Sequence, residues 1–533
     1  MLMPQRERAI FFVFTLLLSI IGVSCDLPKA SEKEKTGGVL IIPEYQKPAF
    51  INPLLTSTTL SARLSEIIFD GLIRLDDRFE VRPHIAESWE RSKDGMIWTF
   101  HLRQGVTFHD GVELTAEDVA YTFQMIKEYQ ERIPFAFVFQ DVTGIEVKDK
   151  YTLQVRLRKP IASFLQTLFM GILPKHILDG QDLMKTPFNQ HPIGTGPFQL
   201  KSWSEKEIIL EANHSYFLGR PYLNQIRVIV YLSREAAWAK LISGEVDFFP
   251  YLTPENYEVL KQVPNFSFHS IPMPYYYVVA FNLREEIFRD QRVRQALNYA
   301  VDKDEIVAKV LQDQGQVAAG TVFPSSWIYN PEVRPYPYDP QKALTLLKEA
   351  GWEDHDGDHF LDKDGKLFEF TVHVNAGDDL KQKAVLFIQQ YLLDIGIKTH
   401  VRIFEAANTG FLFKKQFQSC FLEIQAWGDL DLSYLNWHSS QIKNGFNVFS
   451  YQNKQVDQLL EESRVAFDQE KRKRLYFAFQ EKILKDPPGI FLFWTNYLVG
   501  IHQRFKGAQI SPVGPFANIR EWYVPKAEQR YSE

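Results

Sequence analysis

The sequence predicts an α/β protein of about three domains, and three observations support this expectation. The chain has 533 residues, which is too long for one core at roughly 100–200 residues per domain. Hydrophobic residues make up 45% and charged residues 24%, as in globular proteins and unlike disordered chains. Strand and helix patterns alternate along most of the chain. Such repeated β–α–β units imply mostly parallel sheets that helices cover.

In the first half of the chain, strands are predicted where apolar residues run together or alternate. Trp98, Phe100 and Leu102 alternate with polar residues, for example, as in a half-buried strand. Thr115, followed three residues later by Asp118, indicates a capping box at the start of a helix. The predicted strands span 39–43, 97–103, 151–159, 226–232 and 246–249, and the predicted helices span 59–71, 114–129 and 234–242.

The second half of the chain keeps this alternation. Asp290 and Asp339 precede helical runs as N-caps, and Gly351 ends the second of these helices. Pro340 suits the first position of a helix, where a missing N–H costs nothing. The predicted strands span 275–283, 368–374, 398–404 and 489–494, and the predicted helices span 292–301, 343–350, 381–396, 453–467 and 469–485.

The charge and the motifs exclude several classes of function. Lysine and arginine number 60 against 66 aspartates and glutamates, a formal charge of −6, so no basic footprint favours nucleic acid. The chain has no Walker loop, no GxGxxG after a strand and no CxxC pair. It also lacks a GxSxG elbow and an HExxH motif. Aromatic residues reach 14%, which fits a large core or an aromatic-lined cleft.

The N-terminus has the pattern of a secretory signal. Arg6 and Arg8 form a positive region, and residues 10–23 form a nearly unbroken apolar run. This run is shorter than the ~20 apolar residues that span a bilayer, so a permanent transmembrane helix is the weaker interpretation. We therefore expect an exported protein.

The end of the apolar run resembles a bacterial lipoprotein signal, in which a cysteine becomes the lipidated first residue. Cys25 holds that position, although Gly22 stands where such signals usually carry leucine. Plain cleavage near Ser24 is the alternative. The polar stretch that follows is typical of a flexible tether.

One dense motif lies at residues 86–123, which read AESWERSKDGMIWTFHLRQGVTFHDGVELTAEDVAYTF. Five further blocks follow it in order: PIGTGPF (192–198), FNL with RVRQALNYAVDK (281–303), LLKEAGW (346–352), WHSSQIKNGFN (437–447) and YQNKQVDQLLEESR (451–464). Together they resemble the family 5 extracellular solute-binding proteins, which include dipeptide-, oligopeptide- and nickel-binding components of ABC importers. The resemblance runs from about Gly38 to the C-terminus.

The resemblance implies a two-lobed periplasmic-binding-protein fold of the large peptide-binding type. The chain would cross a two-strand hinge near 275–283 and 489–494, so that the lobes can close around a ligand. The implied division makes 1–24 a signal peptide, 25–37 a lipid-anchored tether, 38–56 with 191–280 and 490–533 lobe I, 57–190 an extra subdomain of lobe I, and 281–489 lobe II.

The resemblance also implies the function. We expect a receptor in the bacterial cell envelope that captures a solute, foremost an oligopeptide, and delivers it to ABC-transporter permease subunits. It would be a monomer that meets the membrane through its lipid anchor, with no catalytic residues, no cofactor and no nucleic-acid partner. The alternatives are the same fold binding a nickel chelate or an oligosaccharide, and a secreted hydrolase. A glycosidase would need two facing carboxylates.

The candidate ligand-binding residues also follow from the resemblance. In peptide-binding members, an Asp shortly after a Trp in lobe II holds the peptide ammonium. Trp427 matches the Trp, and Asp429 and Asp431 compete for the acidic position, with Asp429 favoured. A charge-assisted hydrogen bond of this kind contributes roughly 1.5–3 kcal/mol.

Further candidates lie at the first predicted crossing. Alternation along a strand would turn Tyr275 and Tyr277 to one face, where their phenols could cover a ligand. Core packing of these tyrosines is the equal alternative. Asn282 follows on the same run and could contact the ligand or the hinge.

An acidic run offers a metal site in principle. Asp354, Asp356 and Asp358 have the spacing of a calcium loop, but the twelfth position holds Gly365 in place of a bidentate glutamate. We therefore predict a solvated turn and no metal site.

Overall fold

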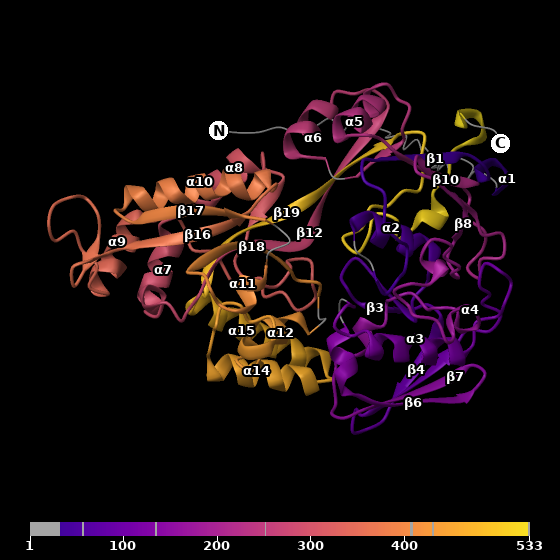
Figure 1. Ribbon diagram of the computed structural model, residues 1–533, viewed down its shortest axis with the longest axis horizontal. Helices are drawn as coiled ribbons and strands as arrows, with labels where there is room; N and C mark the ends of the chain where they lie inside the picture. Colours follow the sequence, from indigo (N-terminus) through magenta and orange to yellow (C-terminus); the bar gives the residue numbers. More distant parts are fainter. Residues whose placement is uncertain are drawn as a thin grey trace, which may run out of the picture.

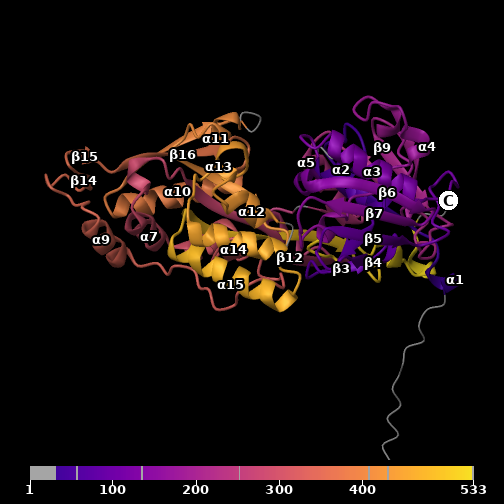
Figure 2. The same ribbon diagram turned by 90° about the horizontal axis from the view of Figure 1, so that it is seen from below.

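The computed structural model describes residues 32–55, 58–133, 136–250, 252–405, 409–428 and 431–530. The predicted signal peptide, Cys25 and Asp429 lie outside these residues. Two bodies lie next to each other along the long axis of the molecule, which we call the first and the second lobe (Figures 1 and 2). The first lobe holds most elements from β1 to β10, and the second holds the helices α7 to α15.

The first lobe is built on two four-stranded sheets, with strand orders β1-β10-β9-β8 and β4-β5-β7-β6. Their strands are β1 (Val39–Glu44), β4 (Ala86–Arg91), β5 (Ile97–Leu102), β6 (Val142–Asp149), β7 (Thr152–Leu157), β8 (Phe198–Trp203), β9 (Glu207–Ala212) and β10 (Gln225–Val230). The remaining elements are α1 (Glu32–Lys35), α2 (Thr59–Ile68), the pair β2 (Ile73–Leu75) and β3 (Val81–Pro83), α3 (Ala116–Glu128) and α4 (Lys175–Leu178).

Two long antiparallel strands, β12 (Phe266–Phe281) and β19 (Gly489–His502), run between the lobes (Figure 1). They belong to a seven-stranded sheet with the order β11-β19-β12-β18-β16-β17, to which β13 adds at β19. The other strands are β11 (Phe248–Phe249), β13 (Gly315–Val317), β16 (Glu369–Asn375), β17 (Lys398–Phe404) and β18 (Ser419–Gln425), and a separate pair is β14 (Asp362–Lys363) and β15 (Lys366–Leu367).

The helices that follow β10 cover this larger sheet and its margins (Figures 1 and 2). They are α5 (Arg234–Ile242), α6 (Pro254–Leu260), α7 (Gln291–Tyr299), α8 (Lys303–Val310), α9 (Pro340–Glu349), α10 (Asp379–Asp394), α11 (Gly410–Phe413), α12 (Leu432–Trp437), α13 (Gln441–Asn444), α14 (Lys454–Val465) and α15 (Gln469–Lys485). Within the described residues, none of these helices combines the length and the apolar run that a bilayer crossing requires.

The mixed α/β class is confirmed, but the expectation of mostly parallel sheets is wrong. Among the described strands, only β1 with β10, and β16 with β17 and β18, pair in parallel. The other pairs are antiparallel, many of them between strands joined by short turns, such as β4 with β5 and β8 with β9. Local alternation reports that a strand exists and which face is buried, but it carries no information on the direction of its neighbour.

The predicted helix starts are confirmed by their caps. The side chain of Thr115 and that of Asp118 form both halves of the capping box of α3. Asp290 accepts a hydrogen bond from a backbone N–H of α7, and Asp339 does the same for α9. These contacts satisfy N–H groups that a helix leaves without an internal partner.

The larger sheet buries both of its faces. Along β12, Tyr277, Val279 and Phe281 pack into one hydrophobic cluster with α7 and α10. Tyr276 and Val278 turn to the other face and join a second cluster, which includes residues of α14 and α15. Residues 276–281 of β12 are therefore buried on both faces, while residues 267–273 and Tyr275 are half-buried.

Candidate functional site

A cavity with a volume of about 480 Å³ lies where the lobes face one another. The first lobe contributes residues of α2, of β2 and of the segment 511–517. The second lobe contributes Gln425 and Trp427, and Tyr275 of the crossing strand β12 lies beside them. Tyr275 pairs with Gln425 where β12 meets β18, and the Gln425 amide donates a hydrogen bond to the Tyr275 hydroxyl at 3.2 Å. The cavity therefore has one wall on each lobe.

Asp70 organises the polar part of the first wall. Its carboxylate accepts hydrogen bonds from Arg74 at 3.0 Å, His84 at 2.6 Å, Tyr216 at 3.1 Å and Thr195 at 3.1 Å. Burial alone would raise the pKa of Asp70, but His84, Arg74 and Tyr216 together hold it well below its ordinary value. Burial also lowers the pKa of His84. Asp70 is thus a fixed negative charge behind the cavity surface.

Two further charged side chains of α2 line the same wall. Arg63 is buried and forms an ion pair with Glu44 of β1. Glu66 lies one turn further along the helix and also lines the cavity. Burial raises the pKa of Glu66 to about 7, although Arg74 and Arg63 oppose the shift.

The second wall is aromatic at Trp427. Its ring lies 5.8 Å from the ring of Phe169 and 6.3 Å from that of Phe79, centroid to centroid. Both phenylalanines come from the first third of the chain, so this tryptophan sits where segments from distant parts of the sequence meet. A half-buried indole in this position presents an apolar face to whatever fills the cavity.

The structure brings two of the predicted site residues together, since Trp427 and Tyr275 both line the cavity. Tyr277 is 8% exposed and packs in the core, with its ring 5.0 Å from that of Phe493. Asn282 is buried and donates hydrogen bonds to the carbonyls of residues 415 and 417, which hold the turn after β12. Neither Tyr277 nor Asn282 reaches the cavity.

Asp431 has a partner inside the protein. Its carboxylate is 2% exposed and lies 2.8 Å from Nε of Arg464. The Arg464 guanidinium also lies 4.0 Å from the ring centroid of Tyr434. Asp431 therefore fastens the loop after β18 to α14 and does not line the cavity. Asp429, the other candidate, falls among the residues that the structure does not describe.

The charged wall of α2 was not predicted. Arg63 and Glu66 are three residues apart, which places them on one side of α2, whereas Asp70 follows the end of the helix, beyond the extended residue Phe69. This spacing is the sequence feature from which the charged wall could have been predicted. A charged stripe on a helix usually faces solvent, and here it lines a cavity together with segments from distant parts of the chain, among them 511–517.

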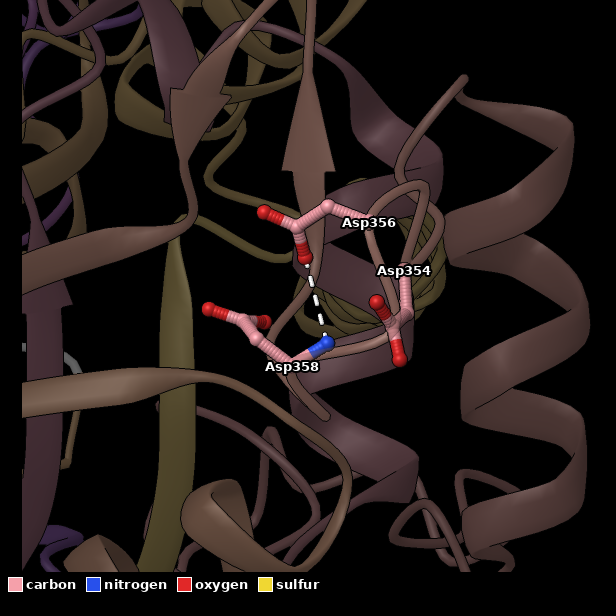
Figure 3. A group of neighbouring side chains, drawn as sticks. All are labelled: Asp354, Asp356 and Asp358. Carbon is pink, nitrogen blue, oxygen red and sulfur yellow. Dashed lines mark hydrogen bonds between the residues drawn. The ribbon is translucent and has the colours of Figure 1, made fainter.

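The acidic run in the second lobe is a turn, as predicted. Oxygens of Asp354, Asp356 and Asp358 lie within 4.8 Å of one another, and all three residues are exposed (Figure 3). Asp354 accepts hydrogen bonds from the N–H groups of Gly357 and His359, and Asp356 accepts one from the N–H of Asp358. These carboxylates serve as turn acceptors.

Comparison with known proteins gives concordant matches. Residues 80–457 match the family model for bacterial extracellular solute-binding proteins, family 5 Middle. The chain is 32% identical to the oligopeptide-binding protein AppA of Bacillus subtilis, with 98% of this chain and all of that protein covered.

Solved structures agree with the sequence matches. The structure of AppA from Bacillus subtilis in complex with a nonapeptide has a TM-score of 0.78 at 31% identity, covering 92% of this chain and all of that one. The structure of NikZ from Campylobacter jejuni in complex with Ni(L-His) also has a TM-score of 0.78, at 30% identity, covering 91% and 99%.

Proposed function

Because the chain belongs to the family 5 bacterial extracellular solute-binding proteins, we propose that it captures an oligopeptide between its lobes and delivers it to the permease of an ABC importer. This is a family of substrate-binding proteins that act outside the cytoplasm, so the chain is a binding protein and not an enzyme. The observation that carries the peptide proposal is a cavity with one wall on each lobe, in a chain similar over its whole length to an oligopeptide-binding protein.

The cavity suits a short peptide for physical reasons. Trp427 offers an apolar face, and Tyr275 of β12 and Gln425 at the end of β18 offer polar groups beside it. We propose that Trp427 and Tyr275 contact the ligand. Asp429, two residues after Trp427, is our candidate for binding the peptide ammonium, with Asp431 and Arg464 holding that loop in place. A charge-assisted bond of this kind strengthens as water leaves the cavity.

Closure would use the two long strands as a hinge. The pairing of β12 with β19 shifts register between Pro272 and Tyr276 and again between Tyr277 and Val278. Register shifts weaken a ladder locally, because residues there lack a partner on the facing strand. We propose that lobe I, formed by 38–56, 191–280 and 490–533 with the subdomain 57–190, closes onto lobe II, formed by 281–489, about this point.

A peptide titration tests the proposal. Pentapeptides of mixed composition are expected to change the tryptophan fluorescence and to reduce the radius of gyration measured by X-ray scattering. Trp427→Phe should retain binding measured by calorimetry but lose most of the fluorescence change, while Trp238→Phe, which is not part of the cavity lining, should lose none of it. If no peptide binds but nickel with histidine does, the ligand is a metal chelate and the peptide assignment fails.

We further propose that the mature protein is anchored through lipid on Cys25. In a bacterial host, the wild-type chain is expected in the membrane fraction, and Cys25→Ser in the soluble extracytoplasmic or culture fraction. Fractionation with immunodetection measures this, and Cys420→Ser is the matched control because that thiol is buried. Membrane retention of Cys25→Ser would contradict the anchor.

A further inference from the structure

Glu66 lies on the first-lobe wall of the cavity without a hydrogen bond or ion pair to any described residue. It projects from α2 toward the segment 511–517. A Cβ atom at Gly514 would collide with its carboxylate, so glycine at 514 leaves the room that the carboxylate occupies. The side chain is half-buried and lines the cavity.

The neighbouring charges leave Glu66 as an excess negative charge. Arg63 is paired with Glu44, and Arg74 with Asp70. Arg520, a further arginine of the lining, lies 3.2 Å from Glu521. Each arginine of the described lining thus has its own carboxylate. A carboxylate in a partly dehydrated cavity is costly unless a cation compensates it.

The charged groups around Glu66 allow its carboxylate to gain or lose a proton when a ligand binds. Arg63 on its own helix and Arg74 of β2 are the charged groups that act on it, and the segment 511–517 carries no titratable side chain. The other titratable groups of the described lining are Asp70, Tyr216, Tyr275, Tyr497 and Arg520. The pKa of about 7 that burial gives Glu66 means that a bound cation would favour its ionised form and release a proton.

We propose that Glu66 selects ligands that carry a positively charged group, an ammonium or a guanidinium, and holds that group against the first-lobe wall of the cavity. The inference rests on the proposed function and specifies the ligand class for the same cavity. The cation can be the side chain of a lysine or arginine within a peptide whose N-terminus lies at Asp429, or the free N-terminus itself in a peptide that places this end at Glu66. Both present the same chemistry to a carboxylate.

Three pentapeptide pools separate these sources. The first has free N-termini and no basic residue, the second is N-acetylated with one lysine or arginine, and the third is N-acetylated with none. Wild type, Glu66→Gln and the exposed control Glu87→Gln are titrated by calorimetry at pH 6 and pH 8, and their unfolding temperatures are recorded. Glu66→Gln is expected to unfold at the same temperature as wild type or higher at pH 8, because ionised Glu66 costs stability above its ordinary pKa.

Compared with wild type, Glu66→Gln is expected to lose roughly tenfold to a hundredfold in affinity for a peptide pool. This loss should be confined to one of the two cationic pools, the one that wild type binds more tightly. For wild type, affinity for that pool should fall between pH 8 and pH 6, as Glu66 takes up a proton, and this dependence should vanish in Glu66→Gln. Glu87→Gln should match wild type. Equal loss across all pools that bind, or no loss in any, would overturn the role of Glu66. Failure of wild type to bind every pool would instead refute the peptide function.

Discussion

Asp247→Ala is expected to lower the free energy of unfolding by about 3–5 kcal/mol, because it leaves a buried arginine without its carboxylate. Asp247 is 1% exposed, and its carboxylate accepts hydrogen bonds from Nε and Nη2 of Arg504 at 3.1 and 2.6 Å. It also accepts one from the N–H of Ile41 at 3.0 Å. This one side chain ties β1 to the end of β19, so the damage would fall on the first lobe beside the crossing strands.

Burial raises the pKa of Asp247, although Arg504 opposes the shift, which indicates that dehydration of the carboxylate offsets much of the attraction. The Asp247–Arg504 ion pair therefore stabilises the fold little more than two apolar side chains in its place would. Removing only one of the two charges is costly, because the other stays buried without its partner. Asp247→Leu combined with Arg504→Met should recover most of the stability that either change loses alone, as a double-mutant cycle in urea would measure.

The exposed pair Lys348–Glu353, at 3.0 Å, provides the control for Asp247. Glu353→Ala should cost no more than about 1 kcal/mol, because water screens such pairs. Comparable losses for Asp247→Ala and Glu353→Ala would refute the argument from burial.

Much of the local structure could be predicted because its causes are local. Thr115 and Asp118 cap α3 through contacts three residues apart, and the alternation of Trp98 and Phe100 is a property of one strand. The ordered motif blocks also predicted the family correctly. These signals can be read from the sequence without knowing which distant segment packs against each helix or strand.

The crossing strands show where local signals end. The strand predicted at 275–283 belongs to β12, which begins at Phe266. Pro272 and Pro274 break the strand pattern in the sequence, since proline cannot donate to a ladder. In the structure they lie at the register shift between the lobes, where fewer ladder bonds are needed. The feature that hid the strand is the same one that makes this point a candidate hinge.

The cavity could be predicted only in part, for a similar reason. Trp427 was proposed from the resemblance and Tyr275 from strand alternation at the predicted crossing, and both line the cavity. Tyr277 shares their pattern but meets Phe493 of β19, and Asp431 meets Arg464 of α14. The partner that removes each residue from the cavity comes from a distant segment. Sequence spacing assigns residues to a face, while tertiary contacts decide whether that face is open.

Asp70→Asn is expected to cost about 3–5 kcal/mol and to weaken ligand binding. The carboxylate of Asp70 accepts from four donors, on Arg74, His84, Tyr216 and Thr195. An amide of the same shape removes the charge that Arg74 pairs with and places an NH2 group among donors. Arg74 and Tyr216 line the cavity, so their displacement would disturb the ligand-binding wall as well as the core.

The pH dependence of this loss distinguishes charge from shape. Because the pKa of Asp70 is lower in the folded protein than its ordinary 3.8, its ionised form stabilises the fold above about pH 4, and that stability is lost as pH falls toward the folded-state pKa. The difference in unfolding temperature between wild type and Asp70→Asn should be full at pH 7 and shrink below pH 4. Asp179→Asn, at an exposed aspartate, should differ from wild type by no more than about 0.5 kcal/mol throughout. A difference for Asp70→Asn that persists unchanged at pH 3 would mean that packing around the side chain, and not its charge, stabilises this wall of the cavity.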